Sequence, residues 1–503
     1  MLIRIDPRLR STLQLQIYTG LRRAILDRVL APGERVPSSR ELADDLGVSR
    51  TTTLLAMEQL LAEGYLSARR GSGTFVAQEL PDEQVQGGRA SHAPASPRHP
   101  PLSRRGELLS SLPSSSRRIL GPPRAFRIGT PALDLFPVRL WSQLTNRRLR
   151  ALTAAQLDYG AAAGLPALRE AIADHVRKAR GTRCSADQVF VVAGAQRGFE
   201  LICDLLLDVG DRVWVEEPGY PGARSALFAS GARLCPVRVD DEGLDVAWGS
   251  ARARDARLAY VTPSHQFPSG ALMSLARRLA LLRWARAARA WIVEDDYDSE
   301  FRYGSRPIPC LHGLDTDGRV IYIGTFSKTL FPALRLGFLI VPADLHDRLL
   351  AARRCTDLHP PRLDQAVLAD FMAGGHFERH VRRMRAVYGE RQQALAGAVE
   401  RLCGGALRLR PAQTGLHVVA DLADADASRV FEEAAARGVE VMPLSAYVLG
   451  RGRSDNALVL GFGSVRPEML RAGVERLAAA IDAAGRAAPI RSAALRSGLA
   501  ARP

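Results

Sequence analysis

The sequence predicts a multi-domain protein in which a small α+β unit precedes a large α/β domain. Three observations support this prediction. Residues 12–78 combine helical periodicity with glycine stops, which is typical of a compact helical unit. From about residue 126 to residue 485, short apolar runs alternate with helical patterns, as in a parallel sheet covered by helices. Residues 79–125, rich in Pro, Ser and Arg, are typical of a flexible linker between the two.

The N-terminal unit, assigned to residues 1–78, begins with a predicted helix over about residues 13–29. Its apolar residues recur at every fourth position: Leu13, Ile17, Leu21 and Ile25. A second helix is expected to begin at Ser38, because Ser38 and Glu41 form an S-x-x-E capping box. Gly47 is expected to end it.

A third helix is predicted over residues 49–63. The apolar positions expected to face its core side are Leu54, Met57 and Leu61. Two short helices around a glycine turn are typical of a helix-turn-helix. Residues 65–76 then predict two short strands joined by a basic, glycine-rich tip, so that the unit becomes a winged helix-turn-helix.

The start of the third helix and the strand tip carry side chains suited to DNA. Short hydroxyl groups and arginine can bind phosphates and reach base edges in the major groove. The residues expected to bind DNA are Ser38, Arg40, Ser49, Arg50, Thr51, Thr52, Arg69, Arg70, Gly71 and Gly73. The alternative is a generic three-helix module for protein interactions.

Composition restricts the class of protein further. The net charge of +16 agrees with a nucleic-acid partner, although an arginine-biased composition would produce it without DNA. No run of eighteen apolar residues and no signal-peptide pattern is present, so we expect a cytoplasmic protein without a membrane partner. The six cysteines form no C-x-x-C pair, and no metal site is expected. Residues 486–503 predict a disordered basic tail.

Lysine is almost absent, and one of the two lysines follows an apolar strand-like run. Among 69 Lys and Arg residues, only Lys178 and Lys328 are lysine. Arginine stays protonated and cannot form an imine, whereas a lysine with a lowered pKa can attack a carbonyl. Lys328 is therefore predicted to form a Schiff base, the alternative being an ordinary surface lysine.

Five predicted strands end in residues suited to bind a ligand beyond the carboxyl edge of a sheet. Four of them cover residues 189–192, 212–216, 258–261 and 290–293, and the fifth leads to Lys328. The residues that follow the first four are Ala195, Gln196, Tyr220, His265, Asp295 and Tyr297.

These residue types together predict pyridoxal phosphate (PLP). The helix start at Ala195 and Gln196 can bind a phosphate through free N–H groups, and Tyr220 could stack on a planar ring. A buried carboxylate can keep a pyridine nitrogen protonated, and a tyrosine hydroxyl can bond the phenolic oxygen and help to lower the lysine pKa. Further hydroxyls and a bidentate cation for the phosphate come from Thr325, Ser327 and Arg335.

Two of these pieces have simpler explanations. Tyr220 could be a turn residue that packs on the core. The acidic cluster at 294–300 could bind Mg²⁺ or be solvated, although a metal site should show further converging ligands.

Sequence motifs support the same division of the chain. Residues 12–78 resemble the GntR-type winged helix in PGERVPSSRELA, LGVSRTT, EGYL and RRGSGTFV. The large part resembles fold-type I PLP-dependent enzymes of the aminotransferase superfamily. The motifs VTPSHQFPSG (261–270), EDDYDSEF (294–301) and GTFSKTLFPALRLG (324–337) resemble more specifically the MocR subfamily of GntR regulators, in which a winged helix is fused to an aminotransferase-like domain.

The resemblance implies a role for each candidate residue. Lys328 takes the Schiff-base position, Asp295 the ring nitrogen and Tyr297 the phenolic oxygen. Tyr220 falls on the stacking residue, and His265 lies near the ring oxygen. The positions of the phosphate site are Thr325, Ser327, Arg335, Ala195 and Gln196.

The resemblance also implies a domain-swapped homodimer, because Tyr159 matches the tyrosine that reaches the partner subunit's phosphate. Two positions depart from the aminotransferase pattern. Phe267 stands where an asparagine usually lies beside the ring oxygen, and Val459 stands where many aminotransferases have a carboxylate-binding arginine. Arg466 lies nearby at an unmatched spacing.

The sequence therefore predicts a PLP-dependent DNA-binding transcriptional regulator that responds to PLP or an amino compound. Its expected partners are operator DNA, PLP and a small amine or amino acid. The alternative is a PLP-dependent aminotransferase with an accessory DNA-binding domain. Keto-acid release without a specific DNA footprint would favour that alternative.

Overall fold

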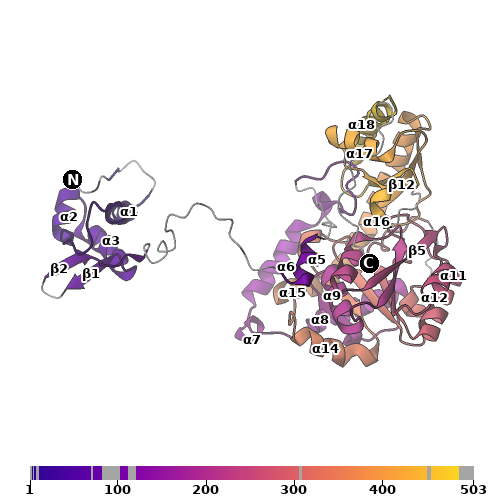
Figure 1. Ribbon diagram of the computed structural model, residues 1–503, viewed down its shortest axis with the longest axis horizontal. Helices are drawn as coiled ribbons and strands as arrows, with labels where there is room; N and C mark the ends of the chain where they lie inside the picture. The colour runs from indigo at the N-terminus through magenta and orange to yellow at the C-terminus, as the bar shows by residue number, and fades with distance from the viewer. Residues whose placement is uncertain are drawn as a thin grey trace. The chain divides into compact units, whose positions relative to one another are not determined.

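The computed structural model describes residues 3, 5–6, 11–69, 72–81, 102–111, 121–304, 309–449 and 455–486. The chain divides into two compact units, one up to Leu102 and the other from Ser103 onward (Figure 1). No helix in the described part of the chain is long and apolar enough to cross a membrane.

The first unit is a winged helix-turn-helix, as predicted. Its elements are α1 (Leu13–Leu26), α2 (Ser39–Leu46), α3 (Arg50–Ala62), β1 (Leu66–Arg69) and β2 (Gly73–Val76). The two strands form an antiparallel hairpin in which Leu66 lies opposite Val76 and Arg69 opposite Gly73. All three helices pack together around one apolar core.

Local sequence accounts for most of these boundaries. The Ser38–Glu41 capping box is formed, and Gly47 ends α2 in the left-handed conformation (φ 64°). α1 ends three residues earlier than expected, because Arg28 adopts a left-handed backbone (φ 61°). The prediction for Leu54 was wrong: its side chain is 41% exposed, and Thr53 fills the buried position instead.

Eight strands form the central sheet of the second unit, in the order β3-β10-β9-β8-β7-β4-β5-β6. The strands are β3 (Val189–Val192), β4 (Arg212–Glu217), β5 (Arg233–Asp240), β6 (Gly243–Leu244), β7 (Leu258–Val261), β8 (Trp291–Asp296), β9 (Val320–Thr325) and β10 (Gly337–Ile340). The run from β9 to β5 is parallel. β10 runs antiparallel to both of its neighbours, which the sequence did not predict.

Helices cover both faces of this sheet (Figure 1). Val189 and Val191 pack toward α6, α8 and α15, whereas Phe190 and Val192 pack toward α9, α10 and α14. This alternation along one strand produces the predicted α/β arrangement. The helices are α5 (Arg104–Ser111), α6 (Val138–Arg150), α7 (Ala154–Leu157), α8 (Pro166–Arg180), α9 (Ala195–Leu206), α10 (Pro221–Ala229), α11 (Val246–Arg252), α12 (Leu275–Ala288), α13 (Leu311–Leu314), α14 (His346–Arg354) and α15 (Arg362–Ala373).

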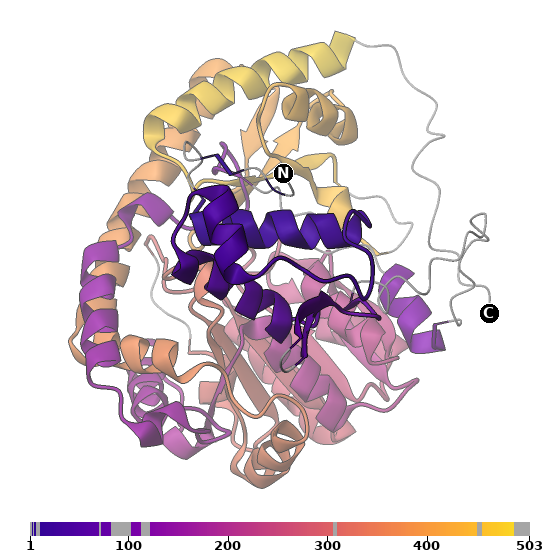
Figure 2. The same ribbon diagram turned by 90° about the vertical axis from the view of Figure 1, so that its left-hand side faces the viewer.

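The C-terminal part builds a second, antiparallel sheet with its own apolar core. Its strands are β11 (Leu407–Leu409), β12 (His417–Leu422), β13 (Met442–Pro443) and β14 (Ala457–Gly461), and its helices are α16 (His376–Leu402), α17 (Ala427–Ala436) and α18 (Pro467–Arg486). α18 packs against α16 and α17 (Figure 1; Figure 2).

The segment expected to be a linker, 79–125, has structure in two places. Helix α5 lies inside it and contacts α10. Ala125, at its end, is buried, and the next residue, Phe126, pairs with Gly461 of β14. The segment that precedes α6 therefore packs against the small sheet.

Candidate cofactor site and candidate DNA-binding surface

Lys328 lies three residues after β9, at the carboxyl edge of the parallel strands. Its Nζ donates a hydrogen bond to the carbonyl oxygen of Gly129 at 2.6 Å. Gly129 has a left-handed backbone (φ 70°), and a Cβ atom there would lie 2.7 Å from Nζ. The entering segment therefore passes against the lysine, a contact between residues 199 positions apart that no local pattern predicts.

Asp295, at the end of β8, is buried with one oxygen free. Tyr260 donates its hydroxyl to Oδ2 at 2.8 Å, while Oδ1 has no hydrogen-bond partner within the described structure. Burial raises the pKa of Asp295 to about 7, and the positive charge of Lys328 opposes that rise. An unpaired buried carboxylate oxygen is costly, so Oδ1 is suited to accept a hydrogen bond from a bound group.

The acidic cluster around Asp295 is not solvated. Glu294 and Asp296 are also buried. Glu294 accepts the N–H groups of Leu311 and His312, and Asp296 pairs with Arg180. Both flanking carboxylates are therefore structural, and Asp295 alone presents a free buried oxygen.

The predicted phosphate residues lie at the N-terminus of α9 and in the turn after β9. Gly194 precedes α9 with φ 82°, and a Cβ atom there would lie 3.2 Å from the Arg335 guanidinium carbon. Arg335 is exposed and donates to the carbonyl of Ala193 at 3.1 Å. Gln196 donates to the Gly222 carbonyl at 3.3 Å. Arg335 and the helix start thus form a cationic cradle with free N–H groups.

Thr325 ends β9, and Ser327 lies with Lys328 in the turn that follows. The Ser327 backbone N–H donates to Thr325 Oγ1 at 3.2 Å. This local bond fixes the turn and leaves the Thr325 hydroxyl hydrogen available as a donor.

Tyr220 is half-buried at the start of α10. Its ring meets Phe267 edge to face, with centroids 5.5 Å apart. A Cβ atom on Gly222 would lie 2.6 Å from the Tyr220 ring, so glycine is needed there to make room for it. The aromatic pair places Tyr220 beside the loop at residues 262–270.

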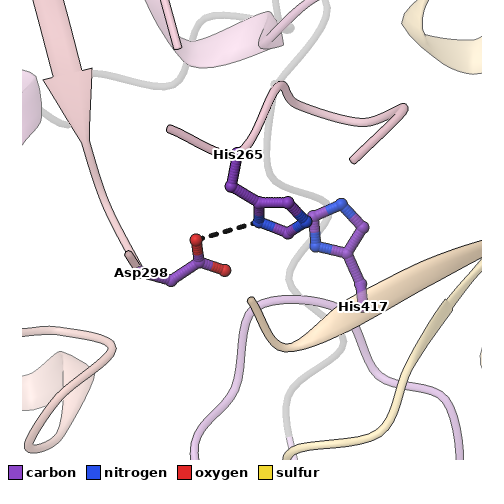
Figure 3. A group of neighbouring side chains, drawn as sticks. All are labelled: His265, Asp298 and His417. Atoms are coloured by element: carbon purple, nitrogen blue, oxygen red, sulfur yellow. Dashed lines mark hydrogen bonds and ion pairs between the residues drawn. The ribbon is translucent and has the colours of Figure 1, made fainter. Parts of the chain in front are cut away.

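His265 lies in a buried cluster with Asp298 and His417 (Figure 3), and the half-buried Tyr297 contacts it through its hydroxyl. His265 Nδ1 lies 2.9 Å from Asp298 Oδ1 and 3.0 Å from the Tyr297 hydroxyl. The ring of His417 lies 4.6 Å from that of His265, between centroids. Sequence reasoning singled out Tyr297 and His265 but missed their two partners.

Glu216, at the end of β4, is a further buried carboxylate that the sequence analysis missed. It accepts hydrogen bonds from the Thr262 N–H and hydroxyl, at 3.0 and 2.6 Å, and from Gln266. Burial raises the pKa of Glu216 to about 7. Its place at the end of an apolar strand was the available signal, and it holds the loop that carries His265 and Phe267.

Two other predicted positions lie around the site. Tyr159 is 80% exposed and meets His359 edge to face at 6.3 Å. Val459 is fully buried in β14 and packs in an apolar cluster with Tyr447 and Phe267. Arg466, the nearby cation, points to Asp134 at 3.3 Å and its side chain is 69% exposed.

The start of α3 presents the predicted DNA-binding residues. Ser49 caps the helix by accepting the Thr52 N–H at 3.2 Å, and the exposed side chains of Arg50 and Thr51 follow. Thr53 fixes α3 against α2 by donating its hydroxyl to the Ser39 carbonyl at 2.8 Å. Ser38 is committed to its capping box, whereas Arg40 is exposed.

The hairpin carries the remaining predicted contacts. The Arg69 guanidinium lies 4.9 Å from the centre of the Phe75 ring, and Gly73 is exposed. Arg70 and Gly71 lie outside the described residues.

Comparison with known proteins finds two families in the chain. Residues 13–76 match the family of bacterial regulatory proteins of the gntR family, and residues 131–477 match aminotransferase class I and II. The chain is 40% identical over 466 residues to the probable rhizopine catabolism regulatory protein MocR of Rhizobium meliloti, covering 92% of this chain and 93% of that one. It is 33% identical to the HTH-type pyridoxine biosynthesis transcriptional regulator PdxR of Corynebacterium glutamicum, covering 93% and 96%.

The large unit is also similar to a solved enzyme. The α-aminoadipate aminotransferase LysN of Thermus thermophilus, determined in complex with N-(5'-phosphopyridoxyl)-L-leucine, superposes with a TM-score of 0.69 at 29% identity, over 75% of this chain and 97% of that one. With both family models matched in this order and a MocR protein matched over nearly its whole length, the chain belongs to the MocR-type regulators of the GntR family, in which a winged helix precedes a fold-type I aminotransferase domain.

Proposed function

We propose that this chain is a transcriptional regulator that binds operator DNA through its winged helix and PLP through its large unit. The observation that carries the proposal is that Lys328 and the free buried oxygen of Asp295 lie at the ends of neighbouring parallel strands, β9 and β8. The charge of Lys328 acts on Asp295, which supports their facing one common space.

The residues present fit PLP. Asp295 Oδ1 would accept a hydrogen bond from the protonated ring nitrogen, and Tyr297 would donate one to the phenolic oxygen. Arg335, Thr325, Ser327 and the N–H groups of Ala195 and Gln196 would hold the phosphate. When bound, PLP supplies an aldehyde for Lys328 and an electron-withdrawing ring.

We infer that PLP itself or an added amine is the signal. An amine that takes the place of Lys328 on the cofactor would release the lysine, and the freed Nζ has an acceptor in the Gly129 carbonyl. A ligand can shift the chain from one arrangement to another, and so alter its DNA affinity, only if the contacts that the ligand makes differ between the two arrangements.

The alternative activity, amino-group transfer, is supported by the aminotransferase relatives. Two features weigh against amino-acid turnover. Val459 offers only an apolar surface at the position expected for a carboxylate-binding arginine, and Phe267 cannot hydrogen-bond a ring oxygen through its side chain.

We propose a homodimer. Large apolar side chains are exposed along α6, α7 and the following turn: Val138 at 63%, Leu157 at 74% and Tyr159 at 80%. Burying such a surface against a second copy would remove apolar area from water, and Tyr159 would then reach the partner subunit's site.

The test is borohydride reduction of the purified chain with PLP, followed by mass measurement. The wild type should gain the mass of one reduced cofactor per chain, and Lys328→Ala and Lys328→Arg should gain none. Lys178→Ala is the matched control, because Lys178 is the other lysine and lies exposed on α8. An unlabelled wild type, or label retained in Lys328→Ala, would refute the cofactor assignment.

The regulatory part needs a DNA measurement. A footprint upstream of the neighbouring gene should strengthen, weaken or move when PLP is added. Keto-acid release from candidate amines, with no specific footprint, would favour the aminotransferase instead.

A further inference from the structure

His265 is held between two hydrogen-bonding groups on one of its ring nitrogens. Nδ1 lies 2.9 Å from Asp298 Oδ1 and 3.0 Å from the Tyr297 hydroxyl. The second Asp298 oxygen accepts the Leu416 N–H at 3.2 Å. The carboxylate is therefore fixed from both sides, and it faces the imidazole in one orientation (Figure 3).

Two independent observations assign the proton of His265 to Nδ1. A carboxylate only accepts hydrogen bonds, so the nitrogen beside Asp298 must be the donor. The other nitrogen, Nε2, is buried and has no acceptor within the described residues, so a proton there would be an unpaired buried donor. The Nε2–H tautomer and the doubly protonated ring are both disfavoured by that missing acceptor.

His417 packs beside His265, and its hydrogen lies on the other ring nitrogen, Nε2. Its Nε2 lies 3.1 Å from the carbonyl oxygen of Pro268, which can only accept, so Nε2 carries the hydrogen. Burial holds the pKa of His417 well below its usual range.

The same three side chains are ligand types for a metal ion, but their hydrogen bonds argue against that use. His265 Nδ1 and both Asp298 oxygens already have partners in the chain. A cation there would have to displace the Leu416 N–H or the His265 proton.

The tautomer decides where the Tyr297 proton goes. With a hydrogen on Nδ1, His265 has no lone pair facing Tyr297, so the tyrosine hydroxyl cannot donate to it. Tyr297 keeps its proton, since burial and the surrounding carboxylates raise its pKa well above the ordinary value. Its O–H is therefore left for another acceptor.

We propose that Asp298 is a positioning residue for cofactor binding: by fixing the Nδ1–H form of His265, it keeps the Tyr297 hydroxyl free to donate to the phenolic oxygen of PLP. This inference rests on the proposed PLP site. Asp298 acts through His265 and Tyr297 and need not touch the cofactor.

The carboxylates that act on Tyr297 come from β4, from β8 and from the turn after β8. They are Glu216, Asp295, Asp296 and Asp298. The His265 imidazole lies beside the hydroxyl, and Lys328 acts on the neighbouring Asp295 and His417. Asp298 is the one among them that bonds directly to the Tyr297 neighbour His265.

The decisive variant is Asp298→Asn in the full-length, PLP-loaded chain. If the asparagine oxygen keeps the Leu416 N–H, its amide donates to His265 Nδ1. That nitrogen then becomes an acceptor and competes for the Tyr297 proton. A hydrogen bond to the phenolic oxygen favours the form of the bound cofactor that has lost the neighbouring imine proton. Loss of that bond in the variant should therefore raise the pH midpoint of the cofactor's absorbance change by about one unit, the effect of one hydrogen bond.

A double-mutant cycle separates this role from a merely structural one. Tyr297→Phe should raise the midpoint similarly, and Asp298→Asn should add nothing in the Tyr297→Phe background. Equal, additive shifts in both backgrounds, or an unshifted midpoint in Asp298→Asn, would overturn the proposal.

A second measurement does not need the cofactor. Nitrogen-15 NMR of the histidine-labelled wild type should show His265 as the Nδ1–H tautomer, assigned by its loss in His265→Gln. An Nε2–H form in the wild type would refute the inference even if Asp298→Asn fails to fold. If the wild type shows Nδ1–H but never acquires a lysine-linked chromophore, the PLP proposal fails and the proton assignment stands.

Discussion

At the scale of single residues, Asp295 lowers the stability of the cofactor-free protein but is suited to bind the cofactor. Burial raises its pKa to about 7, so the folded, cofactor-free chain favours the protonated acid. The contribution of Asp295 to stability is therefore most favourable below about pH 4, the ordinary range of an aspartate, and declines as pH rises toward 7. A positively charged ring nitrogen beside Oδ1 would offset that cost.

We predict opposite effects of Asp295→Asn on stability and on binding. At pH 8 the free energy of unfolding of the cofactor-free variant should equal that of the wild type or exceed it by up to roughly 1–3 kcal/mol, because a buried charge is removed. Its stability should vary less between pH 4 and pH 7 than that of the wild type. PLP binding should weaken at the same time. Denaturant titrations at several pH values and equilibrium dialysis with PLP measure both, and tighter PLP binding in the variant would contradict this role.

At the scale of elements, strand ends were predictable and contacts between distant segments were not. The runs before Tyr220, His265, Asp295 and Lys328 became β4, β7, β8 and β9, because continuous apolar runs bounded by polar residues are typical of buried parallel strands. The contact of Gly129 with Lys328 and that of Tyr260 with Asp295 depend on tertiary packing, which local periodicity does not encode. The antiparallel direction of β10 was not predicted, because strand direction leaves no mark on its short sequence of one glycine and three apolar residues.

The entering segment gives a test at this scale. Gly129→Ala should weaken PLP binding about tenfold or more, because the added Cβ would lie 2.7 Å from Nζ and displace the lysine. Gly181→Ala is the matched control: its φ of 68° is nearly the same, and nothing lies within 4 Å of a Cβ there. Both should lose about 1–2 kcal/mol of stability from the left-handed backbone. Equal PLP affinities in the two variants would show that Gly129 serves the backbone alone.

Helix α3 gives a test of DNA binding at the same scale. Arg50→Ala should weaken operator binding by roughly 1–3 kcal/mol, since Arg50 is exposed at the start of the helix predicted to enter the major groove. Arg286→Ala removes the same charge from α12, where the side chain is 73% exposed, and should leave affinity nearly unchanged. Band-shift titrations at fixed salt compare the two, and equal losses would mean that net charge alone matters.

At the scale of the whole molecule, the two units were predictable because each has its own signals. The N-terminal unit is defined by caps and a glycine turn, and the large unit by strand and helix alternation. The separate antiparallel sheet was not expected, because a short apolar run such as that of β14 also fits a parallel strand. Helix α5 was missed because it has few apolar residues and no periodic stripe in the Ser- and Arg-rich stretch.

If PLP binding and DNA binding are linked through the whole chain, their coupling must be reciprocal. Saturating PLP should change operator affinity by a factor corresponding to about 1–3 kcal/mol, and saturating operator DNA should change PLP affinity by the same factor. Two titrations on one preparation measure the two factors, with a scrambled duplex as the DNA control. Lys328→Arg keeps the positive charge but cannot bond the aldehyde, so PLP should no longer alter its operator affinity. Operator affinity that PLP leaves unchanged in the wild type would contradict the linkage, and a PLP effect that persists in Lys328→Arg would mean that PLP acts on DNA binding by another route than the lysine after β9.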